Sequence, residues 1–166
     1  GPILSRRLGR SFGINLLPLD RKICTFDCVY CQYGPSEPDQ ENLSSINFPT
    51  LDAVLSRIEN VLRKPRSIDY LTFSGNGEPT LHPEFPAIVD GVVKLRDKLR
   101  PDLKLAIFSN GTQFNRQSVL RSLQKLDAPM IKLDAGDEIT FQSVNRPSQP
   151  VDFWQIIEGM RGLKNL

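Results

Sequence analysis

The chain has 166 residues, which is enough for one domain with a sizeable hydrophobic core. Its 39% apolar and 24% charged residues exclude a disordered chain, a collagen and a coiled coil, and its net charge of +2 is too small to indicate a nucleic-acid partner by itself. No run approaches the roughly 20 apolar residues of a membrane span, and no signal peptide opens the sequence, so we expect a globular protein without a membrane partner.

Strand and helix patterns alternate along the chain. A first strand is expected at residues 14–17 or 22–24, followed by a proline-containing loop over residues 34–49. Thr50 is expected to cap an amphipathic helix that Pro65 ends. The next expected elements are a strand at 68–73, a helix from about Phe85, a strand at 103–108, a helix at 115–126, a strand at 130–133 and a helix capped by Asp152.

This alternation predicts an α/β fold with about four β–α units of parallel type. In such folds, the loops that follow the carboxyl ends of the strands carry the functional residues. The unusual motifs of this sequence occupy such positions.

All three cysteines lie in the segment Cys24-Thr-Phe-Asp-Cys28-Val-Tyr-Cys31. An odd number of cysteines so close together argues against a disulfide-stapled secreted domain and favours a reducing cytoplasm. A short loop of this kind can fold back so that three thiolates reach one inorganic centre, and a cubane iron–sulfur cluster with three cysteines keeps one iron open. The alternatives are a zinc site with His82 as fourth ligand, although cysteine-rich zinc sites normally use two separated pairs, and three structural thiols.

A glycine-rich motif, Gly75-Asn-Gly-Glu-Pro-Thr80, follows the second expected strand, at 68–73. Gly75 and Gly77 would let backbone atoms approach a ligand, and Glu78 would accept a hydrogen bond from an ammonium group. Thr80 stands where a dinucleotide-binding fingerprint needs its third glycine, which excludes that reading. A plain strand-to-helix turn is the alternative.

Two further strand ends carry polar residues. Ser109 and Asn110 end one strand, where Asn-Gly is also an ordinary turn signal. Lys132 and Asp134 fall on one face by the period-two rule, so we expect both charges to point into the mouth of the barrel. Such opposite charges either pair with each other or bind a ligand.

Isolated charged residues supply weaker candidates. His82 either contacts a ligand or caps and packs a helix start, and Arg146 either binds a carboxylate in bidentate fashion or lies on the surface. Arg6, Arg7 and Arg10 either hold phosphates, as in RNA, or form a solvated strand edge.

The cysteine spacing resembles the Cys-x3-Cys-x-aromatic-Cys signature of the radical S-adenosylmethionine (SAM) superfamily, with Tyr30 in the aromatic position. The resemblance implies a [4Fe-4S] cluster ligated by Cys24, Cys28 and Cys31, whose open iron chelates SAM. It also implies an enzyme in which the reduced cluster cleaves SAM to methionine and a 5′-deoxyadenosyl radical that abstracts hydrogen from a substrate. A reductant such as flavodoxin or ferredoxin is the implied electron donor.

The same resemblance assigns roles to residues of this chain. Asn76-Gly77-Glu78 stands where the family has Gly-Gly-Glu, the triplet that holds the amino group of SAM. The implied cofactor-binding residues are Tyr30, Gly75, Asn76, Gly77, Glu78, Ser109, Asn110 and Arg146, and Lys132 and Asp134 are the implied catalytic residues.

Four segments together are similar to the wyosine-synthase-like branch of the superfamily: residues 5–11, 28–32, 75–80 and 132–137. The true wyosine synthases of this branch modify transfer RNA with a second cluster. This sequence has no cysteine outside residues 24–31, which counts against wyosine synthesis itself. The family domain is a partial barrel of six β–α units, so residues 1–166 are expected to be the N-terminal part of a longer partial barrel. Two rival functions remain open, a SAM-binding iron–sulfur fragment without turnover and a zinc-binding interaction module.

Overall fold

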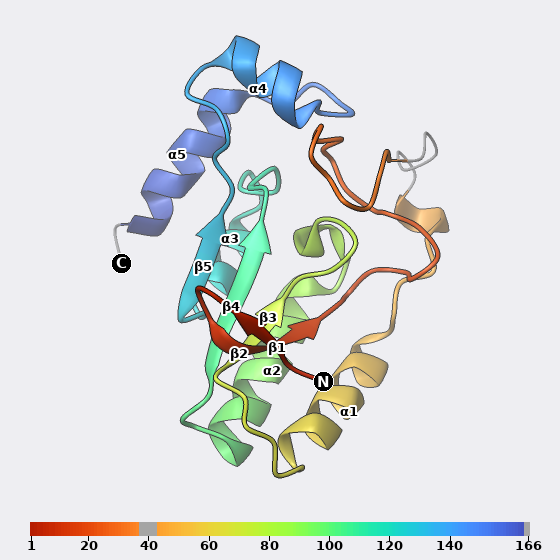
Figure 1. The fold of residues 1–166 in the computed structure, drawn as a ribbon, viewed down its shortest axis with the longest axis vertical. Coiled ribbons are helices and arrows are strands. Elements are labelled where there is room, and N and C mark those ends of the chain that lie inside the picture. The colour runs from red at the N-terminus through yellow and green to blue at the C-terminus, as the bar shows by residue number, and fades with distance from the viewer. Residues whose placement is uncertain (37–42, 165–166) are drawn as a thin grey trace.

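The sheet has five strands in the order β1-β2-β3-β4-β5 (Figure 1). This computed structural model describes residues 1–36 and 43–164. β1 (Ile3–Ser5) is antiparallel to β2 (Gly9–Ile14), and β2, β3 (Tyr70–Phe73), β4 (Lys104–Ser109) and β5 (Ala128–Ile131) are parallel. The carboxyl ends of the four parallel strands therefore meet at one edge of the sheet.

Helices follow the strands, as the sequence predicts. They are α1 (Leu51–Leu62), α2 (Phe85–Leu99), α3 (Gln117–Leu123), α4 (Glu138–Asn145) and α5 (Phe153–Lys164), with short 3-10 turns η2 (Leu43–Ser45) and η3 (Pro79–Leu81). Within the described residues, no helix has the length and apolar character to cross a membrane.

The main core lies between one face of the sheet and α1, α2 and α3. The strands contribute large apolar side chains, and the helices contribute an apolar stripe at helical spacing. The core residues from the strands are Ile14, Leu71, Phe73, Leu105 and Ile107, and those from the helices include Val54, Ile58, Phe85, Ile88, Val89, Val92, Val119 and Leu123.

The other face of the sheet carries smaller side chains in its centre. The strand register places Gly13 beside Thr72, and Thr72 beside Ala106. Thr72 also shares a 2.7 Å hydrogen bond with Ser11 between their hydroxyl groups. A face built from small residues leaves space above it, which is the arrangement that a partial barrel requires. The predicted α/β class is therefore confirmed, and the architecture is consistent with a radical SAM partial barrel.

The predicted first strand is wrong. The first parallel strand is β2 at Gly9–Ile14, and only Ile23 of the second alternative takes part in an isolated bridge, with Gly77. β2 alternates small side chains with Phe12 and Ile14, a pattern that polar–apolar alternation does not detect. β1 was not expected at all.

Other boundaries also differ from the expectations. Thr50 does cap α1, accepting a hydrogen bond from the amide of Ala53 at 3.3 Å, and the side chain of Asp152 accepts one from the amide of Trp154 at 2.8 Å. α3 is shorter than the expected helix at 115–126, and β5 ends at Ile131, so that the expected strand at 130–133 is displaced. Residues 37–42 of the expected loop at 34–49 lie outside the described residues.

The sequence reasoning missed α4. This helix begins after Asp137, whose carboxylate accepts hydrogen bonds from the amide of Thr140 at 2.9 Å and from its hydroxyl at 2.8 Å. An N-cap aspartate is a recognisable start signal, so the information was present in the sequence.

Candidate functional site

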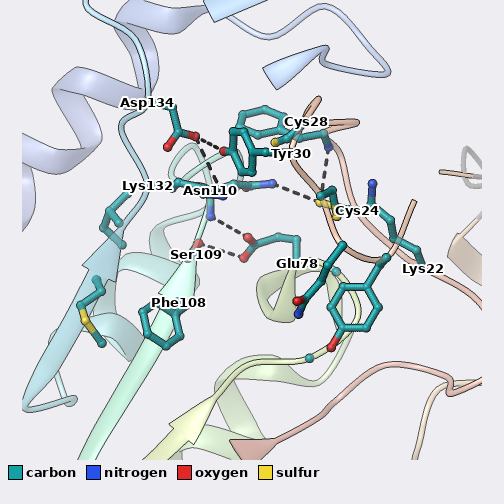
Figure 2. A pocket seen from close by; sticks show the side chains of 18 of the residues that line it. Lys22, Cys24, Cys28, Tyr30, Glu78, Phe108, Ser109, Asn110, Lys132 and Asp134 are labelled. Carbon is teal, nitrogen blue, oxygen red and sulfur yellow. Dashed lines mark hydrogen bonds and ion pairs between the residues drawn. The ribbon is translucent and has the colours of Figure 1, made fainter. Parts of the chain in front are cut away.

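A cavity of about 660 Å³ lies where the carboxyl ends of the parallel strands meet the cysteine loop (Figure 2). In this view, Lys132 and Asp134 lie on the β5 side and Cys24 on the side of the cysteine loop, with Glu78 and Asn110 between them. The predicted site residues that line the cavity are Cys24, Cys28, Tyr30, Cys31, Gly75, Gly77, Glu78, Ser109, Asn110, Lys132 and Asp134.

Asn76 and Arg146 are predicted site residues that do not contribute to this lining. The side-chain amide of Asn76 instead donates to the backbone carbonyls of Pro18, at 2.5 Å, and Arg21. Arg146 is exposed, with a left-handed backbone φ of 46°. Asn76 therefore holds the segment that leads into the cysteine loop, and Arg146 lies outside the cavity.

Gly77 permits a close contact between the glycine-rich loop and the start of the cysteine loop. Its neighbours Asn76 and Glu78 pair with Ile23, because the Ile23 amide donates to the Asn76 carbonyl at 3.1 Å and the Glu78 amide donates to the Ile23 carbonyl at 2.8 Å. A Cβ atom on Gly77 would lie 1.8 Å from that Ile23 carbonyl oxygen, and one on Gly75 would lie 2.0 Å from Oδ1 of Asn15. Both positions therefore require glycine for the packing of the chain itself, independently of any contact with a ligand.

Glu78 joins the loop after β3 to the end of β4. Its buried carboxylate accepts hydrogen bonds from the amide and hydroxyl of Thr80, at 3.1 and 2.5 Å, and from the hydroxyl of Ser109 at 2.8 Å. The Asn110 amide donates to its other oxygen at 2.7 Å. Burial raises the pKa of Glu78, and the hydrogen bonds from Thr80, Asn110 and Ser109 oppose that shift. Both oxygens of this carboxylate are thus held in place by the protein at the cavity wall.

Two of the three thiols accept hydrogen bonds from side-chain amides. Asn110 Nδ2 lies 3.7 Å from the sulfur of Cys24 and also donates to Thr25 Oγ1 at 2.9 Å. Asn145 Nδ2 donates to the sulfur of Cys28 at 3.4 Å. Burial raises the pKa of the Cys24 thiol to about 12. None of the three cysteines, all of which lie in the described part of the chain, is joined in a disulfide.

Asn145 is a site residue that the sequence reasoning missed. Asn145 is the last residue of α4. The segment 144–148 lies beside the cysteine loop (Figure 1). Backbone hydrogen bonds of 3.0 Å join Val29 to Val144, Asp27 to both Asn145 and Arg146, and Ser148 to Thr25. Once α4 is known to end here, its last residue is a natural candidate, but no motif marks Asn145 in the sequence.

Tyr30, Lys132 and Asp134 form one group at the cavity mouth. The Tyr30 hydroxyl donates to Asp134 Oδ2, which also accepts a hydrogen bond from Asn145 at 2.7 Å. Lys132 Nζ lies 4.2 Å from the centre of the Tyr30 ring and 4.0 Å from Asp134 Oδ2. Burial and the hydrogen bond to Asp134 raise the pKa of Tyr30. Both charges reach the cavity, as expected, yet the side chains of Lys132 and Asp134 remain 42% and 25% exposed, so the mouth is open.

His82 has structural partners and does not line the cavity. Its Nδ1 accepts from the amide of Glu84 at 3.1 Å, so the proton lies on Nε2, which donates to the carbonyl of Pro49 at 2.8 Å. Burial lowers the pKa of His82 and so favours the neutral ring. The only histidine of the chain is therefore not placed to complete a zinc site with the cysteines.

The three N-terminal arginines have different surroundings. Arg10 pairs with Asp69 through Nη2–Oδ1 and Nε–Oδ2 contacts of 2.7 and 3.1 Å, and these bonds lower the pKa of Asp69 to about 2. Of the three, only Arg7 lines the cavity.

Comparison with known proteins now places the chain in a family. Residues 21–166 match the family model of the radical SAM superfamily, so the chain belongs to the radical SAM superfamily. This match establishes the superfamily, and the wyosine-synthase-like branch stays a prediction.

Individual relatives agree with this assignment. A UPF0026 protein of Helicobacter pylori is 36% identical over 96% of this chain and 49% of its own length. A protein of Brachyspira hyodysenteriae named GTPase Obg is 31% identical over 96% of this chain and 22% of its own length. The GTP 3′,8-cyclase of Mycobacterium ulcerans is 28% identical over 99% of this chain and 42% of its own length. The chain thus spans half or less of the length of these relatives.

Proposed function

We propose that this protein is a radical SAM iron–sulfur enzyme in which Cys24, Cys28 and Cys31 hold a [4Fe-4S] cluster and the adjoining cavity holds SAM. The observation that carries the proposal is that the three thiols share one cavity with Glu78, at the carboxyl ends of parallel strands. Membership of the superfamily supports it independently.

The donor set fits an iron–sulfur cluster. Cys24, Cys28 and Cys31 all line one cavity, and three thiolates leave one iron of a cubane open. Amide donors directed at the sulfurs of Cys24 and Cys28 are also typical of cluster ligands, because hydrogen bonds to sulfur tune the cluster.

When bound, the cluster with SAM supplies a 5′-deoxyadenosyl radical that abstracts hydrogen from a substrate. The chain's own residues bind and orient the reactants and exclude water. In this proposal, the backbone of residues 75–77 and the carboxylate of Glu78 contact the SAM amino group, and Tyr30, Ser109 and Asn110 contact the rest of SAM. Lys132 and Asp134 face the substrate side. Asn76 contributes backbone only, and Arg146 is left out because it lies outside the cavity lining.

The wider setting follows from the same proposal. In the proposal, residues 1–166 form the N-terminal part of a longer partial barrel, and the greater length of the relatives supports a longer protein. A reductant such as flavodoxin or ferredoxin supplies the electron, the cytoplasm supplies the reducing conditions, and RNA is a candidate substrate. The GTP 3′,8-cyclase relative supports an enzymatic role.

A second candidate is a SAM-binding iron–sulfur fragment that does not turn SAM over. The observation in its favour is that the chain covers only about half of the UPF0026 relative, so parts of the pocket can lie outside it.

The test is product formation. The chain is reconstituted anaerobically with iron and sulfide, reduced with dithionite and incubated with SAM, and 5′-deoxyadenosine is quantified by chromatography. We expect 5′-deoxyadenosine from the wild-type chain and none from Cys28→Ser. Cluster and SAM binding without product would favour the fragment without turnover. Zinc without sulfide would contradict both candidates.

A further inference from the structure

Arg7 lines the cavity, although it does not follow the carboxyl end of a parallel strand. It lies in the turn between β1 and β2, the hairpin at the red end of the chain in Figure 1, and lines the same cavity as the cysteines. β2 starts at Gly9 and ends at Ile14, beside the cavity edge of the sheet. The turn therefore lies about 16 Å, at the usual rise per residue, from the strand ends that carry the proposed SAM site.

The other charged groups of the cavity have partners within the protein. Lys22 Nζ contacts Asp27 Oδ1 at 3.0 Å and the Gly34 carbonyl at 2.9 Å. Lys132 lies against Asp134 and Tyr30, and Glu78 accepts the hydrogen bonds described above. Among the residues that the structure describes, no hydrogen bond or ion pair engages the guanidinium of Arg7. Among the described residues, the positive charge of Arg7 at the cavity thus has no neutralising partner.

An exposed aromatic ring lines the same cavity. Phe108 is 41% exposed, although its neighbours Ile107 and Ser109 in β4 are buried. Met130 lies beside it in register on β5, and both side chains line the cavity. Apolar surface inside a concave site is typical of a ligand pocket, and a phenyl ring offers a flat face for a planar ligand.

We propose that Arg7 and Phe108 form the substrate subsite, in which Arg7 binds a phosphate and Phe108 stacks on the planar ring that carries it. The planar guanidinium presents paired donors that match phosphate oxygens. This chemistry selects a nucleotide, either free or within an RNA chain. The inference rests on the proposed function and adds the class of substrate to it. SAM carries no phosphate, so phosphate dependence separates this subsite from the SAM site.

The test compares Arg7→Gln with Arg6→Gln, a neighbouring exposed arginine that does not line the cavity. Dissociation constants of the four ribonucleoside 5′-monophosphates and of the matching nucleosides are measured by anaerobic calorimetry on the reconstituted chain with SAM present. We expect at least one monophosphate to bind about tenfold or more tightly than its nucleoside, since a charge-assisted contact is lost with the phosphate. Arg7→Gln should abolish that difference, and Arg6→Gln should preserve it.

A single-stranded oligoribonucleotide mixture forms the second arm. Binding of the oligoribonucleotides that depends on Arg7, without binding of the monophosphates, supports the proposal with RNA as the source of the phosphate. If neither probe shows a dependence on Arg7 that exceeds the dependence on Arg6, the proposal is overturned.

The spectrum of the reduced cluster with SAM, measured without nucleotide, distinguishes failure of this proposal from failure of the proposed function. Arg7→Gln should retain the change that SAM produces in the spectrum of the reduced cluster. Loss of that change would place Arg7 in the SAM site and overturn the substrate assignment. A wild-type chain that forms no cluster would instead contradict the proposed function.

Discussion

At the scale of single residues, Asn145 connects the cysteine loop to the group at the cavity mouth. Its Nδ2 is shared between the Cys28 sulfur and Asp134 Oδ2, and Asp134 also accepts from Tyr30. A hydrogen-bonded path therefore runs from Tyr30 through Asp134 and Asn145 to Cys28. Asn145 is 2% exposed, and its buried Oδ1 has no hydrogen-bond partner among the described residues. Such an unpaired acceptor costs stability, whereas the donors of the same amide engage Cys28 and Asp134.

We predict that Asn145→Leu lowers the reduction potential of the cluster. A hydrogen bond to a ligand sulfur stabilises the more negative reduced state, so its removal should shift the potential downward, by an amount on the order of tens of millivolts. The measurement is a redox titration followed by electron paramagnetic resonance. The control is Gln142→Leu, an exposed position on the same helix. An unchanged potential in Asn145→Leu, with a full complement of iron, would contradict this role.

At the scale of elements, the junction between the glycine-rich loop and the cysteine loop leaves no room for a side chain on Gly77. Gly77→Ala would place a Cβ atom against the Ile23 carbonyl, whereas the Cβ atom of Gly136→Ala would meet nothing within 4 Å. We expect Gly77→Ala to destabilise the fold by about 1–3 kcal/mol and to reduce iron loading, because the start of the cysteine loop must move. Thermal unfolding and iron content per chain are the measurements. Equal losses in the two variants would show that the contact with Ile23 is not the cause.

The hairpin that carries Arg7 is fixed to β3 by Asp69. Its carboxylate accepts from the Arg10 guanidinium and also from the Arg10 amide, at 2.7 Å. The folded pKa of Asp69, about 2, is below the ordinary value of about 4. The ionised pair therefore stabilises the fold above pH about 4, and this contribution is lost as the pH falls through about 2.

We accordingly predict that Asp69→Asn lowers the melting temperature near pH 7 by a small amount, since the pair is exposed, and that the gap from the wild type closes as the pH falls from about 4 to 2. Melting curves across that range test this. The matched control is Asp20→Asn, which removes an exposed aspartate beside Arg21. A gap that persists at pH 2 would show that charge is not responsible.

The elements that could be predicted from the sequence are those that local residue patterns determine. The stripes of α1 and α2, the Thr50 cap and the strands β3 and β4 depend on neighbours in the chain, so they could be predicted. β2 could not, because its alternation of small and large side chains has meaning only once Thr72 and Ala106 lie beside it. For the same reason, the sequence did not reveal that the Asn76 side chain donates hydrogen bonds to the carbonyls of Pro18 and Arg21.

At the scale of the whole molecule, the cavity is assembled from segments far apart in the sequence. The hairpin turn, the cysteine loop and the ends of β3, β4 and β5 each contribute lining residues. The cysteine motif could be recognised from its spacing and the motifs that support it, because the three proposed ligands lie within eight residues of one another. Arg7 and Asn145 could not be placed, since their positions depend on how the hairpin and α4 fold back toward that loop.

The most direct test of the account is the electron paramagnetic resonance spectrum of the reduced, reconstituted chain with and without SAM, together with iron and sulfide content. An open iron that chelates SAM should give a cubane signal whose g values change when SAM is added. We predict about four irons and four sulfides per chain and a clear change in that signal. A cubane signal that SAM leaves unchanged, or one zinc ion without sulfide, would contradict the proposed site.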